Sequence, residues 1–463
     1  MDYYCIVVEG DILTKTAVFL NRVSEKKAAL YAIAALLSVG FGVFVILTAE
    51  KVNVYYPVPT AVIFGALFFA AQALLIAQGR FDALSLLIAA GCLACVIFSR
   101  VSLLYFESRD FTAFLEDWVK KMRALSARDA LVTPIGNYNM PYFYFLLIFS
   151  RLDIAPIISI KAFSCLFDVV LAYYVMKTVA LVTEDRRLLI AAYIVTLGLP
   201  TVLMNSAQWA QCDSIYVAFC VMSLYAAVKG SGRLCAIAWT LAFSFKLQAI
   251  FILPALAVAL FMGQVKPKHL LWIPAVFFLS LVPALIAGRS LGSCLSIYIN
   301  QTQQYPELYA NAPTLWRFFT GVDFEGYSNV TVFLAGTAVL LFMYFCLTGY
   351  KAFAPQDLIR LFFISSMLLP YVLPRMHERY FYMADIMSFL YFLTNRKKWY
   401  IPAAVVLSSV VGYIWYFTAE EGPGVLILDQ RYIALAFLVI LATELRELFC
   451  SYWHRSPDTI VVE

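Results

Sequence analysis

Residues 28–47 read AALYAIAALLSVGFGVFVIL, twenty residues without a charged side chain. A helix needs about 20 apolar residues to cross the hydrocarbon core of a bilayer, so this run predicts a first transmembrane helix. We therefore expect an all-α polytopic membrane protein with about 12–14 transmembrane helices, of which the short central ones are broken or tilted. The other apolar runs lie at 58–78, 83–104, 154–182, 188–204, 213–228, 234–245, 248–262, 270–287, 329–350, 358–373, 380–393, 399–418 and 432–450.

The composition excludes a soluble protein of this size. Hydrophobic residues make up 63% of the 463 residues without counting glycine, and charged residues make up only 14%. Soluble proteins hold about 45–50% and about 25%, respectively. No loop combines a basic patch with aromatic residues, which argues against nucleic acid as a partner. The 10 cysteines are scattered, and we interpret Cys92 and Cys95 as packing residues rather than a redox motif.

Basic residues gather in alternate short loops, and this asymmetry predicts the orientation. Lysine and arginine precede the first run and recur in every second loop, as in Arg396-Lys397-Lys398. Because positively charged loops stay in the cytoplasm, both termini are expected there. The chain then divides into a cytoplasmic segment at 1–27, a transmembrane domain at 28–450, which includes two large outer segments at 105–151 and 288–326, and a cytoplasmic tail at 451–463.

The first outer segment contains an amphipathic stretch. Asp110 comes directly before it, where its carboxylate could act as general base for a hydroxyl nucleophile. Alternatively Asp110 caps the helix, since Asp is a preferred capping residue. Glu116 and Asp117 fit a solvated face of the same helix. The apolar side chains recur at helical spacing and predict an interfacial helix along the outer leaflet, with Phe111, Phe114, Leu115, Trp118, Val119 and Met122 on its apolar face.

Polar residues at the ends of the central runs are the next candidates. Residues 205–214 read NSAQWAQCDS and offer many hydrogen-bonding groups, with Trp209 as a stacking surface, as a polyhydroxylated ligand requires. The alternative is a loop that satisfies its own backbone, with Asp213 capping the next helix. Lys246 lies between two apolar runs and needs an anionic partner. That partner is either a ligand phosphate or a carboxylate, for which Asp168 is a candidate.

The sequence PRMHERY at 374–380 interrupts the apolar stretch from 358 to 393. Two arginines, a histidine and a glutamate within five residues are costly near hydrocarbon, which indicates a function. The guanidinium groups of Arg375 and Arg379 match phosphate oxygens, and His377 and Glu378 could orient them or hold a leaving phosphate. A solvated turn is the alternative, although such turns favour Gly, Asn or Ser. No second ligand stands at metal-site spacing from the histidine, so no metal is expected.

In chain order these elements are an acidic outer loop, N-S-x-x-W-x-Q-x-D-S, K-x-Q, N-A-P at 311–313 and M-H-E-R-Y at 376–380. From about Asp110 to Asp385, this order resembles the GT-C superfamily of integral-membrane glycosyltransferases, and most closely the prokaryotic branch related to the GPI mannosyltransferases. The resemblance implies a multi-pass enzyme of the bacterial plasma membrane that takes mannose or another hexose from a polyprenyl-phosphate-linked donor. Such enzymes transfer the sugar with inversion, on the non-cytoplasmic face, to a hydroxyl of a cell-envelope glycan, lipid or protein.

The resemblance also implies roles for single residues. Asp110 would be the catalytic base. No cofactor or metal is implied, since the first outer loop lacks the D-x-D of metal-assisted relatives. Ala210 stands where similar sequences often have glycine, and Thr314 stands where asparagine is common, so the identity of the substrate stays open. Lys246, Arg375, His377 and Arg379 would contact the donor phosphate, and Trp209, Gln211, Asp213, Gln248, Glu378 and Tyr138 would bind the sugar or the acceptor.

The chemistry of such a transfer agrees with these residue types. A sugar–phosphate bond already has a good leaving group, so the enzyme needs a base for the hydroxyl and positive charge for the departing phosphate. Asp110, Lys246 and Arg379 should therefore line one cavity. The competing interpretation is a polytopic transporter or a flippase for lipid-linked sugars, which would use the same charges to move its substrate. The lack of repeat symmetry and the clustering of the charges at one face argue against it.

Overall fold

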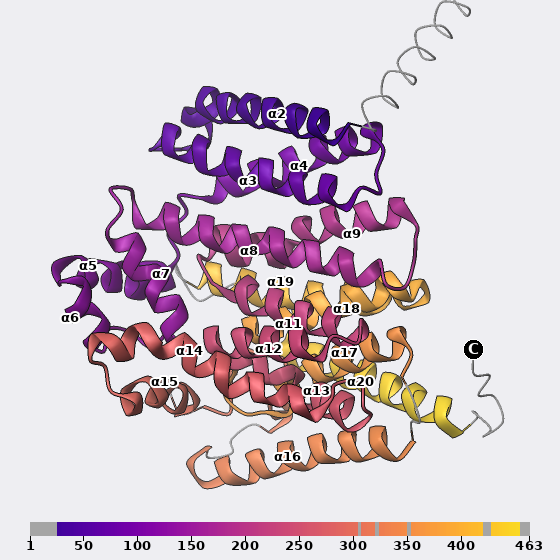
Figure 1. Ribbon diagram of the computed structural model, residues 1–463. Helices are drawn as coiled ribbons and strands as arrows, with labels where there is room; N and C mark the ends of the chain where they lie inside the picture. The colour runs from indigo at the N-terminus through magenta and orange to yellow at the C-terminus, as the bar shows by residue number, and fades with distance from the viewer. Residues whose placement is uncertain (1–25, 304–306, 320–323, 350–352, 420–426, 454–463) are drawn as a thin grey trace, which may run out of the picture.

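Helices make up nearly all of the regular structure (Figure 1). The computed structural model describes residues 26–303, 307–319, 324–349, 353–419 and 427–453. The α-helices are α2 (Lys27–Thr48), α3 (Pro57–Gln78), α4 (Ala83–Leu103), α5 (Glu116–Ala124), α6 (Ala127–Val132), α7 (Met140–Ser150), α8 (Pro156–Val179), α9 (Arg186–Gly198), α10 (Pro200–Leu203), α11 (Asp213–Val228), α12 (Gly232–Phe245), α13 (Leu253–Phe261), α14 (Trp272–Ala287), α15 (Leu291–Gln303), α16 (Phe324–Gly349), α17 (Pro355–Val372), α18 (Tyr382–Thr394), α19 (Tyr400–Thr418) and α20 (Gln430–Trp453).

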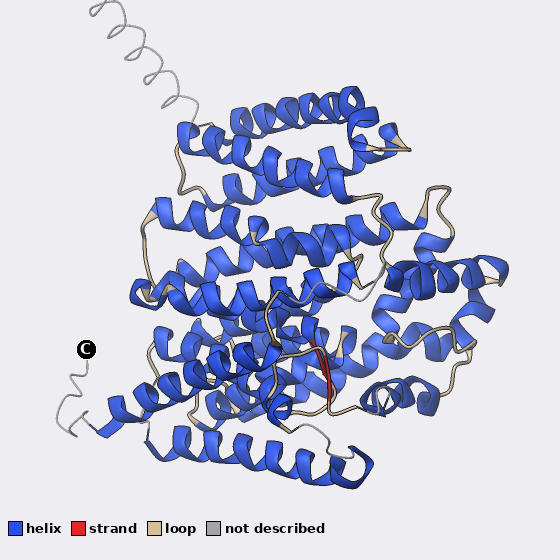
Figure 2. Cartoon of the chain, turned by 180° about the vertical axis from the view of Figure 1, so that it is seen from behind, coloured by secondary structure: helices blue, strands red, loops and turns tan. Residues whose placement is uncertain are grey.

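Short 3-10 helices, π-helices and one strand pair complete the described chain. The strands pair in parallel at the place where the loops of one end of the bundle meet (Figure 2). The expected all-α fold class is therefore confirmed. The short elements are the π-helices η2 (Phe111–Leu115) and η3 (Met204–Gln208), the 3-10 helices η1 (Ala49–Val52), η4 (Leu247–Ile252), η5 (Pro267–Leu271), η6 (Leu315–Phe318), η7 (Glu378–Phe381) and η8 (Arg396–Lys398), and the strands β1 (Tyr309–Ala310) and β2 (Met376–His377).

The helix boundaries follow the expected apolar runs, and the chain is an integral membrane protein. Within the described residues, seven helices are long and apolar enough to cross a membrane, and the bent pair Arg186–Gly198 and Pro200–Gln208 adds an eighth. The pair bends by 47° at the break before Pro200, because proline cannot donate to the helix ladder and disfavours helical backbone at the preceding residue. Apolar helices of 10–17 residues at α7, α11, α12 and the η4–α13 segment are too short to cross alone. The expected 12–14 spans include α11, α12 and the η4–α13 segment, whereas α7 belongs to the expected first outer segment.

The helices stack in layers (Figure 1). The helices α2, α3 and α4 form one edge of the bundle, α8 and α9 lie next to them, and α16 forms the opposite edge. The middle holds α11, α12, α17, α18 and α19, and nearly every residue of α11 and α18 is buried. The edge helices instead expose large apolar side chains, such as Leu36 at 72%. These apolar surfaces suit contact with lipid.

The first outer segment packs on the protein more than we expected. Among the six apolar side chains predicted for an interfacial helix, all except Phe114 are buried in the main core. The helix α7 lies against α5 and covers this face. The expectation of an apolar face turned toward lipid is therefore wrong. The opposite face is solvated as expected, with exposed ion pairs from Lys120 to Glu116 (2.9 Å) and from Lys121 to Asp117 (2.7 Å).

Two arginines fix α5 and α7 to each other at their C-terminal ends. Arg123, from α5, donates to the carbonyl oxygens of Ser150 (3.0 Å) and Leu152 (3.3 Å) after α7. Arg151 returns the contact by donating to the carbonyl oxygen of Leu125 at 2.7 Å. Cations suit the carbonyl ends of helices, where backbone acceptors lack partners. The outer segment is thus held in a defined position beside the bundle.

A second charged cluster lies at the other end of the central helices. Glu444 of α20 is fully buried and pairs with Arg360 (2.7 Å) and Lys398 (2.8 Å), and Glu447 contacts the same two cations. This cluster lies where α17 begins and α18 ends, whereas residues 374–380 lie where α17 ends and α18 begins. The two charged clusters therefore lie at opposite ends of one helix pair. The expected terminal segments 1–27 and 451–463 fall almost entirely outside the described residues.

Candidate active site

The segment after α4 carries Asp110 into the site. The hydroxyl of Ser108 accepts a hydrogen bond from the backbone N–H of Phe111 at 3.3 Å and donates one to the carbonyl oxygen of Trp209 at 2.8 Å. The side chain of Asp110 makes no capping bond to the π-helix that follows. Ser108 rather than Asp110 therefore serves the N-terminus of this helix, and the alternative role of Asp110 as a cap is wrong.

Three donors converge on one oxygen of the Asp110 carboxylate. Trp209 Nε1 lies 3.0 Å, Gln211 Nε2 2.8 Å and Arg379 Nη1 3.1 Å from Oδ2. No residue within the described chain donates a hydrogen bond to Oδ1, and Asp110 is 22% exposed. One oxygen is thus held in place while the other is available to accept a proton.

Trp209 and Gln211 come from the turn that follows the π-helix η3. Ala210 lies between them with φ +63°, a left-handed conformation that favours glycine. For a residue with a Cβ this conformation costs roughly 1–2 kcal/mol. The turn lets both flanking side chains reach the same carboxylate, so backbone strain coincides with the candidate site.

The indole of Trp209, which donates to the Asp110 carboxylate, is held in place by aromatic packing. It is only 1% exposed and lies against three aromatic rings of α19, at centroid distances of 4.0 Å to Tyr416, 4.9 Å to Tyr413 and 5.2 Å to Phe417. The Tyr416 hydroxyl also accepts a hydrogen bond from the backbone N–H of Asp110 at 3.2 Å. The expectation that Trp209 offers a stacking surface to a ligand is wrong, because α19 covers that surface.

Lys246 finds its anionic partner within the same region of the chain. It pairs with Asp213, the first residue of α11, where the helix N-terminus also favours negative charge. Asp213 is buried and accepts a second hydrogen bond from Asn205 Nδ2 at 2.9 Å. The Lys246 ammonium also lies 5.9 Å from the ring centroid of Tyr138 and 5.8 Å from that of Tyr216, within the range of cation–π attraction.

Asp168, the partner considered for Lys246, is engaged elsewhere. Its carboxylate pairs with Arg100 at 2.9 Å and accepts a hydrogen bond from Ser206 at 2.6 Å. Arg100 also donates to the carbonyl oxygen of Leu197 at 2.9 Å. All these side chains are buried, so the ion pair links α4, α8 and η3. The ion pair contacts Ser206, just before the turn that carries Trp209, and it does not line the cavity, so its role is structural.

The strand pair joins the N-A-P segment to the M-H-E-R-Y segment. Tyr309 is in register with Met376, and Ala310 is in register with His377. The backbone N–H of Arg375 donates to the carbonyl oxygen of Leu308 at 3.0 Å, and its guanidinium donates to the carbonyl of Thr302. Arg375 has φ +64°, so a second residue with a Cβ is held in the left-handed region at this site.

His377 and Glu378 lie beside the cavity rather than in its wall. The ring of His377 lies edge-on to Tyr380 at 5.4 Å, and the side chain of Glu378 packs closely against Gly412. Burial, with the nearby charge of Arg379, lowers the pKa of His377 to about 3, so the imidazole is neutral at pH 7. Burial raises the pKa of Glu378 to about 7. His377 is thus uncharged at pH 7 and lies outside the wall of the cavity.

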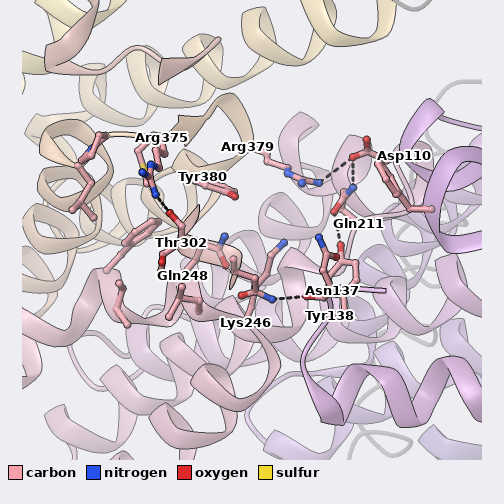
Figure 3. Close-up of a pocket in the computed structure, with 18 of the residues that line it drawn as sticks. Asp110, Asn137, Tyr138, Gln211, Lys246, Gln248, Thr302, Arg375, Arg379 and Tyr380 are labelled. Carbon is pink, nitrogen blue, oxygen red and sulfur yellow. Dashed lines mark hydrogen bonds and ion pairs between the residues drawn. The ribbon is translucent and has the colours of Figure 1, made fainter. Parts of the chain in front are cut away.

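A cavity of about 630 Å³ joins these elements, and Asp110, Lys246 and Arg379 line it together, as expected (Figure 3). Asp110 lies at one end, Arg375 lies at the other end, and Lys246 lies between them. The polar part of the wall is rich in amide side chains: Asn137, Gln211, Gln248, Gln301 and Asn329. The apolar part consists of Phe114, Leu115, Trp118, Leu247, Ile250, Phe251, Val332, Leu373, Pro374 and Met376.

The structure brings together most of the predicted site residues and adds others. Asn137, Gln301, Thr302 and Asn329 also line the cavity, although none of the motifs that carry the resemblance includes them. Tyr416 could have been found from the aromatic spacing of Tyr413, Tyr416 and Phe417 on one helix. The predicted residues that line the cavity are Asp110, Tyr138, Gln211, Lys246, Gln248, Arg375 and Arg379; those that lie behind or beside it are Trp209, Asp213, His377 and Glu378.

In the part of the chain that the structure describes, no three His, Cys, Asp or Glu side chains group as metal ligands would. Comparison of the chain with models of protein families and with curated proteins finds no match.

Proposed function

We propose that this protein is an integral-membrane glycosyltransferase of the GT-C type. It moves a hexose from a polyprenyl-phosphate-linked donor to a hydroxyl of a cell-envelope acceptor, with inversion. The observation that carries the proposal is the Asp110 carboxylate, anchored through one oxygen by three donors in a cavity that also presents three cations, five amides and an apolar wall.

Asp110 is the proposed general base. The acceptor oxygen attacks the anomeric carbon, its proton passes to Oδ1 of Asp110, and the bond between the anomeric carbon and the phosphate oxygen breaks. The bonding electrons leave with the phosphate, so the products are a glycoside and a lipid phosphate. Anchoring Oδ2 fixes the direction of Oδ1, and positioning of this kind is a large part of general-base catalysis.

The other groups of the cavity suit the two halves of such a donor. Amide side chains both donate and accept hydrogen bonds, as sugar hydroxyls require. Lys246, Arg375 and Arg379 line the same cavity and give it the cationic groups that a leaving phosphate requires. The apolar wall reaches Val332 on α16, a helix whose outer surface is apolar and exposed, so a hydrocarbon chain has a route to lipid.

The proposed orientation follows from the charged clusters. The basic loop 396–398 and the cluster around Glu444 lie at one end of the central helices, and the cavity lies at the other. Because basic loops stay in the cytoplasm, we assign the cavity to the non-cytoplasmic face.

A transfer assay tests the proposal. Purified protein receives radiolabelled mannose, glucose or galactose on polyprenyl phosphate, with native membranes as acceptor, and the label that reaches the acceptor is measured. Asp110→Asn should lose about 10²–10⁴-fold in rate. Asp117→Asn is the matched control, since Asp117 is exposed on α5 and paired with Lys121 outside the cavity. If the intact lipid-linked sugar instead crosses the membrane of vesicles that contain the protein, and no sugar reaches an acceptor, the transporter or flippase is supported.

A further inference from the structure

The donor can bind the cavity in two directions, and the charges distinguish them. In an inverting displacement the attacking oxygen and the leaving oxygen lie on opposite sides of the anomeric carbon. The base therefore lies on one side of the sugar, and the leaving phosphate lies on the far side. The cation that receives the phosphate must then be one that lies away from Asp110.

Arg379 is too closely bound to the base for that task. Its Nη1 lies 3.1 Å from Asp110 Oδ2, and its guanidinium carbon lies 5.8 Å from the ring centroid of Trp209, which binds the same oxygen. Lys246 is paired with the buried Asp213. Asp110, Asp213, Lys246 and Arg379 carry two negative and two positive charges, so this half of the site is electrically neutral. Arg379 acts as a positioning residue for the base.

Arg375 lies at the end of the cavity opposite Asp110 (Figure 3). Its backbone is fixed by the hydrogen bond to Leu308 and by the adjoining strand pair, and its guanidinium lies against the Thr302 carbonyl. Leu373, Pro374 and Met376, its neighbours in sequence, belong to the apolar wall. A guanidinium that shares a cavity with an apolar wall matches a phosphate that continues into a hydrocarbon chain.

A route for that chain leads from Arg375 to the edge of the bundle. Val332 lines the cavity and is also 56% exposed on α16, whose surface bears other exposed apolar side chains such as Phe333. Gln248 lines the cavity on the same side as Thr302 (Figure 3), and its Oε1 is buried and accepts no hydrogen bond from the described residues. An unused acceptor at this place suits a hydroxyl of the sugar itself.

We propose that the donor binds with its phosphate at Arg375, its sugar against Gln248 and its hydrocarbon chain passing Val332. The acceptor enters on the Asp110 side of the cavity, where Asn137 and Tyr138 lie near Gln211. This inference rests on the proposed function. The sequence led us to expect that both arginines bind phosphate. The proposal instead gives them separate roles: Arg375 binds the donor phosphate, and Arg379 positions the base.

Binding of a polyprenyl phosphate without sugar tests this direction. The protein is titrated in detergent with the lipid phosphate, and the Kd is measured for the wild type, Arg375→Gln, Arg379→Gln and the control Arg396→Gln, whose side chain is exposed at the other end of the bundle. Loss of a charge-assisted hydrogen bond should weaken binding by Arg375→Gln roughly 10–150-fold. Arg379→Gln should change the Kd less than about threefold, and Arg396→Gln should leave it unchanged. A larger loss for Arg379→Gln than for Arg375→Gln, or equal losses, overturns the proposed direction.

Crosslinking gives a second measurement that does not depend on Arg375 variants folding. A photoreactive amino acid replaces Val332, with the same replacement at Leu36, which is exposed on the opposite edge, as control. The lipid phosphate should crosslink at position 332 and not at 36, and the reverse result contradicts the route. If the wild type binds no polyprenyl phosphate, the proposed function itself fails. If binding occurs but requires Arg379 rather than Arg375, only the direction of the donor is wrong.

Discussion

The indole of Trp209 lies face to face with the phenol ring of Tyr416, with 4.0 Å between centroids and 25° between planes. Tyr416 also accepts a hydrogen bond from the backbone N–H of Asp110, and Trp209 donates to the Asp110 carboxylate. Tyr416 therefore acts on the proposed base twice, once through the backbone and once through the indole. No ligand needs to touch it for it to affect catalysis.

Substitutions of Tyr416 should separate these two contacts. Tyr416→Phe keeps the ring and loses one hydrogen bond worth about 0.5–1.5 kcal/mol, so we expect a roughly 2–13-fold lower kcat. Tyr416→Leu also loses the stacking, which is worth about 0.5–1.5 kcal/mol more, and should lower kcat further. The KM for the donor should stay unchanged in both variants. A Leu variant as active as the wild type would show that the stacked pair does not position the base.

The left-handed backbone at Ala210 predicts an unusual order of stability. Ala210→Gly removes roughly 1–2 kcal/mol of strain and adds about 0.4–1 kcal/mol of chain entropy to the unfolded state, so the variant should be as stable as the wild type or slightly more stable. Ala210→Val places a branched side chain at a positive φ in a buried turn and should lower both the unfolding temperature and the transfer rate. Thermal unfolding in detergent measures the first effect. Unfolding of Ala210→Gly below the wild-type temperature would contradict the argument.

Variants of the Lys246–Asp213 pair should separate the contribution of Lys246 to stability from its contribution to the transfer rate. Lys246→Met alone leaves the Asp213 carboxylate buried without its cation and should destabilise the protein by about 3–5 kcal/mol. The double variant Lys246→Met with Asp213→Asn removes both charges and should recover most of that stability. Its transfer rate should stay low if Lys246 stabilises the reaction. Full recovery of both stability and rate would assign Lys246 a structural role alone.

Glu378 and His377 should give opposite dependences of stability on pH. The folded state raises the pKa of Glu378 from 4.5 to about 7, so it holds a proton that the unfolded chain releases, and this stabilisation is lost as the pH rises from 4.5 to 7. The folded state lowers the pKa of His377 from 6.5 to about 3, so this contribution is complete above pH 6.5 and is lost as the pH falls toward 3. Between pH 4.5 and 6.5 the two slopes cancel.

Variants of one residue at a time should therefore reveal the pH dependence of stability that each group contributes. Glu378→Gln should become more stable as the pH rises from 4.5 to 6.5, and His377→Gln should become less stable over the same range. The slope is at most about 1.4 kcal/mol per pH unit for one proton. The measurement is the unfolding temperature of each variant at several pH values in this range. If the unfolding temperature changes with pH in the same direction in both variants, the argument from burial of these groups is contradicted.

The ion cluster at the far end of the helices predicts a large difference between two neighbouring glutamates. Glu444 is fully buried against Arg360 and Lys398, so Glu444→Gln should destabilise the protein by up to about 3–5 kcal/mol. Glu447 is 51% exposed, and Glu447→Gln should cost no more than about 1 kcal/mol. Both should keep the Kd for the donor. Equal losses of unfolding temperature would mean that burial does not govern the strength of these pairs.

The sequence predicts the helices well because lipid demands long apolar runs, and α11 begins and ends at the expected residues 213 and 228. It predicts less well which side chains meet. Asp168 and Asp213 both lie within apolar runs, and only the packing of the helices decides that Arg100 pairs with Asp168 and Lys246 with Asp213. The burial of Trp209 likewise depends on α19, more than 180 residues further along the chain, which no local pattern connects to it.

The separation of Asp110 from its ion-pair partner also fixes the order in which the site matures during synthesis. Arg379 follows Asp110 by 269 residues, whereas Trp209 and Gln211 follow by only 99 and 101. At about 5–20 residues per second, the ribosome adds the arginine roughly 13–54 s after the acid. During synthesis, Trp209 and Gln211 can thus bind the Asp110 carboxylate before Arg379 is made. A chain that ends before residue 379 lacks the arginine that pairs with Asp110.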